Sequence, residues 1–361
     1  MRKYNFGAGP AMLPTSILQE AQNELLDWNG LGMSVIEVGH RTPAFQKLLE
    51  ETEADLRLLL DIPENYIIRF LGGAARTQFS MIPMNFLNHD QAGGYLVTGT
   101  WSSLAYQEAL KLKSAYCLAT NEEQGFQQLP TWDISAVKEK TGYLYYTPNE
   151  TIQGIRYPTV PKVQGIPLVA DMTSSLLTEP IQVKDYDLIF AGAQKNVANA
   201  GLTIVILNKQ WLEACAPRVL PSMLDYRVHL VEKTYATPPT FNCYLAGKMF
   251  KWLLNQGGMQ AIYEKNLEKS WLLYELIENS TFYHCNVPKN SRSLVNICFH
   301  ITDPSLQTQF LADAEKSGLL ALKGHRLVGG LRASLYNSMP LEGVKSLTRF
   351  MENFAKKHAP H

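Results

Sequence analysis

Between about residues 66 and 207, short apolar runs rich in β-branched and aromatic residues alternate with amphipathic stretches. The runs have the length of strands, and several are followed by apolar residues at helical spacing. Such alternation is typical of a largely parallel sheet that is covered by crossover helices. The pattern predicts seven strands, at Ile67–Leu71, Gly94–Thr98, Ala115–Ala119, Gly142–Tyr146, Pro167–Ala170, Leu188–Ala191 and Thr203–Leu207.

The pattern changes after about residue 245, where two long helical stretches come before the next strand. We expect helices at Leu245–Asn255 and Met259–Ile277, a strand at Leu294–His300, a helix near 305–317, a strand near 327–336 and a closing helix from Leu341. The segment Pro217–Pro239 has four prolines and no clear period, so we expect an extended connection. The prediction is therefore an α/β protein. Its large domain, residues 1–245, has a mostly parallel seven-stranded sheet and an N-terminal segment able to pack with a smaller C-terminal α/β domain, residues 246–361.

The composition is that of a compact globular protein, with 361 residues, 46% hydrophobic and 18% charged. Because 33 Lys plus Arg balance 33 Asp plus Glu, we expect neither nucleic acid nor a membrane surface as the main partner. Met1–Gly7 lacks the apolar stretch of a signal peptide, and no apolar run approaches the roughly 20 residues of a membrane span. The five scattered cysteines include no C-x-x-C pair. We therefore expect a cytoplasmic protein without a metal site.

A glycine-rich turn lies between a predicted strand and a helical pattern at Leu71–Phe79. The start of a helix offers unpaired N–H groups and the positive end of the helix dipole, and glycines let a ligand come close. The turn can therefore receive a phosphate. Because it is neither a Walker A motif nor a G-x-G-x-x-G fingerprint, it fits a plain tight turn as well.

Two other strand ends carry an acid and a lysine. Asp171 follows one predicted strand, and Lys195 follows the next strand through small residues. The carboxyl ends of strands in an open α/β sheet face the ligand crevice. Taken singly, Asp171 can cap the following segment and Lys195 can be a solvated turn residue. Together they suit pyridoxal phosphate, whose aldehyde needs a lysine Schiff base and whose ring nitrogen needs an acid partner.

The tripeptide Gly-His-Arg occurs twice, at 39–41 and at 324–326, and Arg332 follows the second copy. Arginine binds carboxylate and phosphate through two hydrogen bonds, and a neighbouring histidine can donate another. In a neutral chain these clusters indicate a small anionic substrate, although either tripeptide alone can form surface ion pairs. Trp101 lies at a further strand-to-helix turn, where an indole can belong to the core or lie flat on a cofactor ring.

Several ordered motifs resemble those of the phosphoserine aminotransferase family, which are pyridoxal-phosphate enzymes of fold type I. The resemblance spans nearly the whole sequence. The matching motifs are Asn5–Ala11, Gly32–Arg41, Asn149–Gly154, Ala191–Asn196, Thr237–Phe241 and Gly324–Asn337. The resemblance implies the fold type I architecture, pyridoxal 5′-phosphate as cofactor, and a homodimer whose active sites use both subunits.

The resemblance implies that three side chains meet the cofactor ring. Lys195 forms the Schiff base, Asp171 pairs with the pyridine nitrogen, and Trp101 stacks on the ring face. Thr151 lies near the phenolic oxygen. The residues implied for the cofactor phosphate are Ala75, Arg76, Gln194 and, from the neighbouring subunit, Thr237.

For the substrate, the resemblance implies that Arg332 grips the α-carboxylate. The second anionic group, a phosphate or the side-chain carboxylate of glutamate, is held by His40, Arg41, Arg76, His325 and Arg326. The implied activity is ping-pong transamination between glutamate and 3-phosphohydroxypyruvate, giving O-phosphoserine and 2-oxoglutarate for serine biosynthesis. In some bacteria the family also handles 4-phosphohydroxythreonine for pyridoxine biosynthesis, and the sequence leaves that activity open.

The chain departs from the family pattern at Gly7, Gly39, Pro43, Glu179 and Ala236. Ala236 stands where the family has an asparagine before Thr237. The missing amide removes one possible hydrogen bond to the cofactor phosphate of the partner subunit, which is worth about 1 kcal/mol. None of these positions coincides with Lys195, Asp171 or Trp101.

Three alternatives remain on the same scaffold. Two are enzymes, an alanine–glyoxylate-type aminotransferase and a cysteine desulfurase, and the third is a catalytically silent binding protein. A desulfurase needs a nucleophilic cysteine on a mobile loop, and no cysteine of this chain lies in a recognised motif. Two Gly-His-Arg sites also suit a substrate with a second anion better than they suit alanine. A silent protein would not respond to glutamate.

Overall fold

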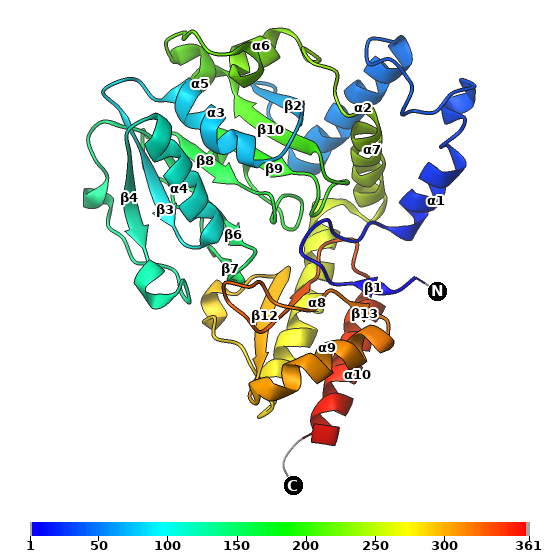
Figure 1. Cartoon of the computed structure of the whole chain (residues 1–361). Coiled ribbons are helices and arrows are strands. Elements are labelled where there is room, and N and C mark those ends of the chain that lie inside the picture. The colour runs from blue at the N-terminus through cyan, green and yellow to red at the C-terminus, as the bar shows by residue number, and fades with distance from the viewer. Residues whose placement is uncertain (1, 359–361) are drawn as a thin grey trace.

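The structure is a computed structural model and describes residues 2–358. Seven strands form a central sheet in the order β2-β10-β9-β8-β5-β3-β4, in the upper part of Figure 1. Their bounds are β2 (Tyr66–Gly72), β3 (Ala92–Val97), β4 (Ala115–Thr120), β5 (Thr141–Tyr146), β8 (Leu168–Asp171), β9 (Leu188–Gly192) and β10 (Leu202–Asn208). All seven strands expected from the sequence are confirmed, each with ends within two residues of those predicted.

The sheet is mostly parallel, as expected. Strands β9, β8, β5, β3 and β4 pair in parallel, whereas β10 runs antiparallel to both β2 and β9. Successive side chains of a strand point to opposite faces. Ile189 accordingly packs in a core on one face of the sheet and Phe190 in a core on the other. Because both faces are covered, the strands are apolar throughout rather than alternating.

The helices cover both faces of the sheet. The core on one face includes side chains of α2 (Pro43–Leu60) and α7 (Thr240–Asn255), and that on the other includes α3 (Arg76–Phe86) and α4 (Thr100–Leu112). Thr42 accepts a hydrogen bond from the N–H of Phe45 and so caps α2. The helix α1 (Thr15–Asn23) adds side chains to the first of these cores, and α5 (Lys209–Ala214) adds Leu212 to the second.

A third hydrophobic core lies below the sheet in Figure 1 and is built mainly from the C-terminal part of the chain. Its helices are α8 (Gly258–Glu278), α9 (Gln307–Lys316) and α10 (Leu341–His358), and its antiparallel strands are β11 (Tyr283–His284), β12 (Asn296–Ile301) and β14 (Leu331–Ser334). The order of helices and strands expected after residue 245 is confirmed, although the last strand is shorter than predicted.

The N-terminal segment packs into this C-terminal core. Strand β1 (Tyr4–Asn5) pairs in parallel with β13 (Leu319–Leu320), and Phe6 is fully buried among the C-terminal side chains. At the other end, α7 still contributes Phe250 to a core of the large sheet. The division of the chain at residue 245 stays a prediction.

The segment Pro217–Pro239 is not wholly extended, so that expectation was wrong in part. It contains the helix α6 (Tyr226–Val231), which Asp225 caps by accepting a hydrogen bond from the N–H of Arg227. Tyr226 is buried and packs on Phe86, 5.6 Å between ring centroids. A cap and one buried aromatic ring are enough to stabilise so short a helix, and neither produces a period that the sequence could reveal.

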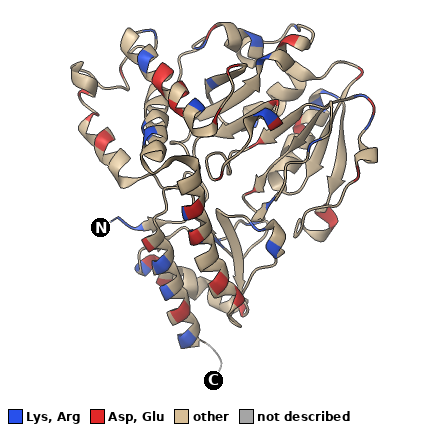
Figure 2. Ribbon diagram, turned by 180° about the vertical axis from the view of Figure 1, so that it is seen from behind, with Lys and Arg blue, Asp and Glu red and all other residues tan. Residues whose placement is uncertain are grey.

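The charges are mixed over the molecule. Seen from behind, Lys and Arg lie interspersed with Asp and Glu along the same helices (Figure 2). Within residues 2–358, no helix combines the length and the apolarity that crossing a membrane requires.

Candidate active site

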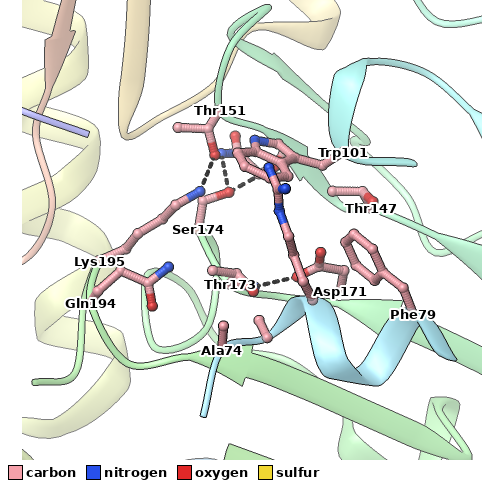
Figure 3. Close-up of a pocket in the computed structure, with 13 residues that line it drawn as sticks. Ala74, Phe79, Trp101, Thr147, Thr151, Asp171, Thr173, Ser174, Gln194 and Lys195 are labelled. Atoms are coloured by element: carbon pink, nitrogen blue, oxygen red, sulfur yellow. Dashed lines mark hydrogen bonds between the residues drawn. The ribbon is translucent and has the colours of Figure 1, made fainter. Parts of the chain in front are cut away.

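A cavity lies at the carboxyl ends of strands β5, β8 and β9 (Figure 3). Its volume of ≈ 140 Å³ is far above the roughly 10–15 Å³ that one water needs, so it can hold a small molecule. It is lined by Ala74, Ala75, Arg76, Phe79, Trp101, Thr147, Asn149, Thr151, Asp171, Thr173, Ser174, Gln194 and Lys195.

Asp171 and Lys195 reach this cavity from neighbouring strands. Asp171 is the last residue of β8, whose parallel partner β9 ends three residues before Lys195. Both are nearly buried, with 5% and 8% of their surface exposed. The parallel pairing of the two strands therefore brings together an acid and an amine that lie 24 residues apart in the chain.

The environment shifts the pKa values of both groups. Burial lowers the pKa of Lys195 to about 8, although the nearby carboxylates of Asp171 and Glu150 act in the opposite direction. The Nζ atom also donates to Oγ1 of Thr151, 2.5 Å away. Burial raises the pKa of Asp171, against its hydrogen bond from the N–H of Thr173 and the charge of Lys195. Lys195 can thus lose its proton near neutral pH and act as a nucleophile or base.

Trp101 forms a flat wall of the cavity. It lies in the first turn of α4, and its ring centroid is 5.4 Å from Nζ of Lys195 and 5.2 Å from the guanidinium carbon of Arg76. Within the described structure, its Nε1 atom is buried and has no hydrogen-bond partner. The indole face is thus turned toward both cations, and its N–H is free to donate to a ligand.

The opposite end of the cavity is the start of a helix. Strand β2 turns at Gly73, whose φ of +118° favours glycine, and α3 begins at Arg76 without a side-chain cap. Gly192 lets Gln194 approach this turn, since a Cβ atom there would lie 2.5 Å from Oε1 of Gln194. An uncapped helix start beside small residues is suited to an anion such as phosphate.

The residues of the cavity fit pyridoxal phosphate. The acid, the amine and the uncapped helix start match the ring nitrogen, the aldehyde and the phosphate of that cofactor. Across the part of the chain that the structure describes, three buried polar atoms at the cavity lack partners: Nε1 of Trp101, Oγ1 of Thr147 and Oδ1 of Asn149. Buried polar groups are rarely left unpaired, and a polar ligand can satisfy them.

Arg332 lies next to the cavity on β14. Its Nη1 atom donates to the carbonyl of Thr151 at 3.4 Å, and its charge lowers the pKa of Lys195. Partial burial and the charges of Arg332 and Arg326 lower the pKa of His325. Neither His325 nor Arg326 lines the cavity of the single chain, so their part in the site stays a prediction.

Besides His325, Arg326 and Arg332, three expected site residues are absent from the lining of the cavity: His40, Arg41 and Thr237. His40 and Arg41 precede α2, and Arg41 forms an exposed ion pair with Glu232 at 3.7 Å. Thr237 lines a separate hollow together with Ala236, and the two hollows share Ala74. The structure of one chain therefore does not bring these three to Lys195.

Glu179, one of the departures from the family pattern, has a partner of its own. Its carboxylate accepts a hydrogen bond at 3.0 Å from Nε of Arg156 and pairs with a second guanidinium nitrogen. Each side chain is 21% exposed. The acid is thus balanced locally, in a bidentate pair.

Six of the lining residues were not among the site residues expected from the sequence: Ala74, Phe79, Thr147, Asn149, Thr173 and Ser174. Thr147 follows the end of β5, and Thr173 follows the end of β8. The rule that identified Asp171, which assigns ligand contacts to the ends of strands, could have identified both.

Comparisons with known proteins agree with this geometry. The model of the aminotransferase class-V family matches residues 3–347. A phosphoserine aminotransferase of Legionella pneumophila (strain Philadelphia 1) is 53% identical over 358 residues, covering 99% of each chain. Among solved structures, phosphoserine aminotransferase from Bacillus circulans subsp. alkalophilus has a TM-score of 0.96 at 38% identity over 99% of each chain. The pyridoxal-phosphate-bound enzyme from Trichomonas vaginalis has a TM-score of 0.92 at 38% identity, over 97% of this chain and all of that chain.

Proposed function

The chain belongs to the class-V aminotransferase family, and we propose that it is a phosphoserine aminotransferase that uses pyridoxal phosphate. The family resemblance expected from the sequence is confirmed by relatives that match almost the whole chain. The enzyme transfers the amino group of glutamate to 3-phosphohydroxypyruvate in a ping-pong reaction, giving O-phosphoserine and 2-oxoglutarate for serine biosynthesis. The observation that carries the proposal is the cavity in which Lys195, Asp171 and Trp101 face one another.

Bound pyridoxal phosphate supplies an aldehyde that takes up the amino group and a protonated ring that withdraws electrons from the substrate Cα. Lys195 holds the cofactor and, once released, moves a proton from the substrate Cα as general base. Its lowered pKa keeps a neutral fraction of the amine near neutral pH. The Asp171 carboxylate would hold the proton on the ring nitrogen, and the Trp101 indole would contact the face of the ring.

Anionic groups of the substrate are bound on the side of β14. Arg332 takes the α-carboxylate, which every substrate carries. Its hydrogen bond to the carbonyl of Thr151 and its effect on the pKa of Lys195 both indicate that its guanidinium lies near the reacting amine. His325, Arg326 and Arg76 take the second anion, the phosphate or the side-chain carboxylate of glutamate. Arginine suits both roles, because its guanidinium binds carboxylate and phosphate through two hydrogen bonds.

The working form in this proposal is a homodimer. His40, Arg41 and Thr237 do not line the cavity of their own chain, which supports the proposal that a second subunit supplies them to a shared site. Exposed apolar side chains close to the Thr237 hollow favour such a contact: Val231 is 89% exposed and Met223 49%. All five cysteines are free, which suits the cytoplasm that we propose as its compartment.

The test compares phosphoserine with serine and alanine as amino donors to 2-oxoglutarate. We expect kcat/KM for phosphoserine to be higher by roughly a hundredfold or more, since its phosphate adds charge-assisted hydrogen bonds. A preference for alanine would favour the alanine–glyoxylate-type alternative and overturn the substrate assignment. The absence of turnover with every donor would favour the silent binding protein. Activity with 4-phosphohydroxythreonine in the same assay decides whether the enzyme also serves pyridoxine biosynthesis.

A further inference from the structure

Glu150 is a buried carboxylate that the reaction described above does not use. It is 0% exposed, and within residues 2–358 it forms no ion pair. Its partners are hydrogen-bond donors: Oε2 accepts from the N–H of Trp101 at 3.0 Å, and Oε1 from the N–H and the hydroxyl of Ser102 at 2.8 and 2.6 Å. A buried anion without a cation is costly unless its oxygens are bonded in this way, so the arrangement calls for a reason.

All three donors belong to the first turn of α4. That helix begins after Gly99, which has no side chain to cap it. The carboxylate of Glu150, 48 to 49 residues further along the chain, therefore bonds N–H groups that a capping residue would otherwise satisfy. Its negative charge also lies at the positive end of the helix dipole.

The lack of a side chain at Gly99 is what allows this approach. The backbone there is extended, with a φ of 179°, so its conformation does not require glycine. A Cβ atom at position 99, however, would lie 2.5 Å from Cδ of Glu150. Gly99 and Glu150 thus form a matched pair, in which the missing side chain of one makes room for the carboxylate of the other.

The loop that follows Glu150 also forms hydrogen bonds with Thr100, the first residue of α4, and with Lys195. Oε1 of Gln153 accepts from the N–H of Thr100 at 3.3 Å, and its Nε2 donates to the Thr100 hydroxyl at 2.8 Å. Thr151, directly after Glu150, bonds Nζ of Lys195. The short hairpin of β6 (Asn149–Glu150) and β7 (Ile155–Arg156) therefore fixes the indole wall and the lysine of the cavity from a single loop.

We propose that Glu150 is a positioning residue that sets the Trp101 indole against the cofactor ring by holding the first turn of α4. The proposal deepens the proposed function and rests on it, because the ring is that of pyridoxal phosphate. Glu150 touches neither the cofactor nor the substrate and acts through Trp101.

The test begins with Glu150→Gln, which keeps the shape but replaces one accepting oxygen with an NH₂ group that faces a backbone N–H. Titrating the full-length, cofactor-free protein with pyridoxal phosphate should show an affinity lowered by roughly 10- to 100-fold, the value of one charge-assisted hydrogen bond. The circular dichroism of the bound cofactor should weaken as well, because the indole no longer lies in a fixed orientation. The matched control is Glu108→Gln, the same substitution on the same helix at a side chain that is 38% exposed and pairs with Lys111, and it should bind the cofactor about as tightly as wild type.

A double-mutant cycle separates positioning from a general structural role. If Glu150 acts through the indole, Glu150→Gln should change cofactor affinity by less than about twofold when Trp101 is already Ala and no ring remains to be positioned. If the double variant instead loses the product of the two single-variant losses in cofactor affinity, the proposal is overturned. Should Glu150→Gln not fold, Gly99→Ala displaces the carboxylate without removing it and has to give the same loss and the same cancellation. Wild-type protein that binds no pyridoxal phosphate would overturn the proposed function as well, whereas normal wild-type binding with multiplying effects would overturn only the role of Glu150.

Discussion

The backbone N–H of Asn337 donates to Oδ1 of Asn196 over 3.0 Å, which ties the loop after β14 to the residue beside Lys195. Nδ2 of Asn196 donates in turn to the carbonyl of Leu176, in the segment that follows Asp171. Both asparagines are buried, with 8% and 3% of their surface exposed. The side chain of Asn196 therefore links the segment after Arg332, the neighbour of Lys195 and the segment after Asp171 through two buried hydrogen bonds.

Asn196→Ala should destabilise the protein by about 1–3 kcal/mol, since it leaves a buried N–H and a buried carbonyl unpaired. It should also raise KM for glutamate, because Arg332 and Lys195 lose their fixed relative position. Urea unfolding and steady-state kinetics check the two effects. Asn290→Ala, at an exposed position, is the control and should change neither. A variant that is destabilised but keeps its KM would show that the contact does not position the site.

Capture of the cofactor by the cofactor-free protein should accelerate with pH. Only the neutral amine of Lys195 attacks the aldehyde, and burial lowers the pKa of that amine to about 8. The rate should therefore rise about tenfold per pH unit below pH 8 and level off above it, which stopped-flow absorbance can follow. Pyridoxamine phosphate, which has no aldehyde, should bind without this rise. A capture rate that continues to climb to pH 10 would contradict the lowered pKa.

Arg332→Ala should raise KM for glutamate, phosphoserine and alanine alike, by roughly 10- to 100-fold, because it removes the contact with a carboxylate that all three share. Arg326→Ala is the matched comparison. It should raise KM for glutamate and phosphoserine but leave alanine unchanged, since alanine has no second anion. Equal effects of the two variants on alanine would reassign both arginines.

Lys269 should make stability depend on pH. Its amine, 3% exposed, donates to the carbonyls of Leu335, Tyr336 and Met339 at 2.9–3.2 Å, and burial lowers its pKa to about 7 from an ordinary value of 10.5. Between these pH values the unfolded chain binds more protons than the folded chain, so stability rises with pH across that window. Below pH 7 both states are charged, and the cost of burying the ammonium is present in full.

The variant Lys269→Met lacks this titration. The free energy of unfolding of wild type relative to Lys269→Met should therefore increase from pH 7 to pH 10, measured by urea unfolding of the cofactor-free protein at one protein concentration. For Lys316→Met the difference from wild type should stay flat, because the Lys316 side chain is 77% exposed. A flat difference for Lys269→Met as well would mean that its three carbonyl partners keep the amine charged.

The sequence predicted the strands well because buried parallel strands are short, apolar and bounded by turn residues, as β8 and β9 are. The rule that strand ends carry ligand contacts then led to Asp171 and Lys195. The same rule could not identify the role of Glu150, because that role depends on a contact between a loop and a helix start 48 residues away in the chain. The helix α6 escaped it too, because its burial depends on contacts with the distant α3. Long-range contacts of this kind leave no periodic trace in the sequence.

The response of the purified protein to glutamate tests the central claim most directly. The account predicts that the yellow absorption of the lysine-bound cofactor disappears on adding glutamate, with one equivalent of 2-oxoglutarate formed per site, and returns on adding 3-phosphohydroxypyruvate. Lys195→Ala should show no such cycle. A wild-type spectrum that glutamate leaves unchanged, in protein shown to contain pyridoxal phosphate, would contradict the account.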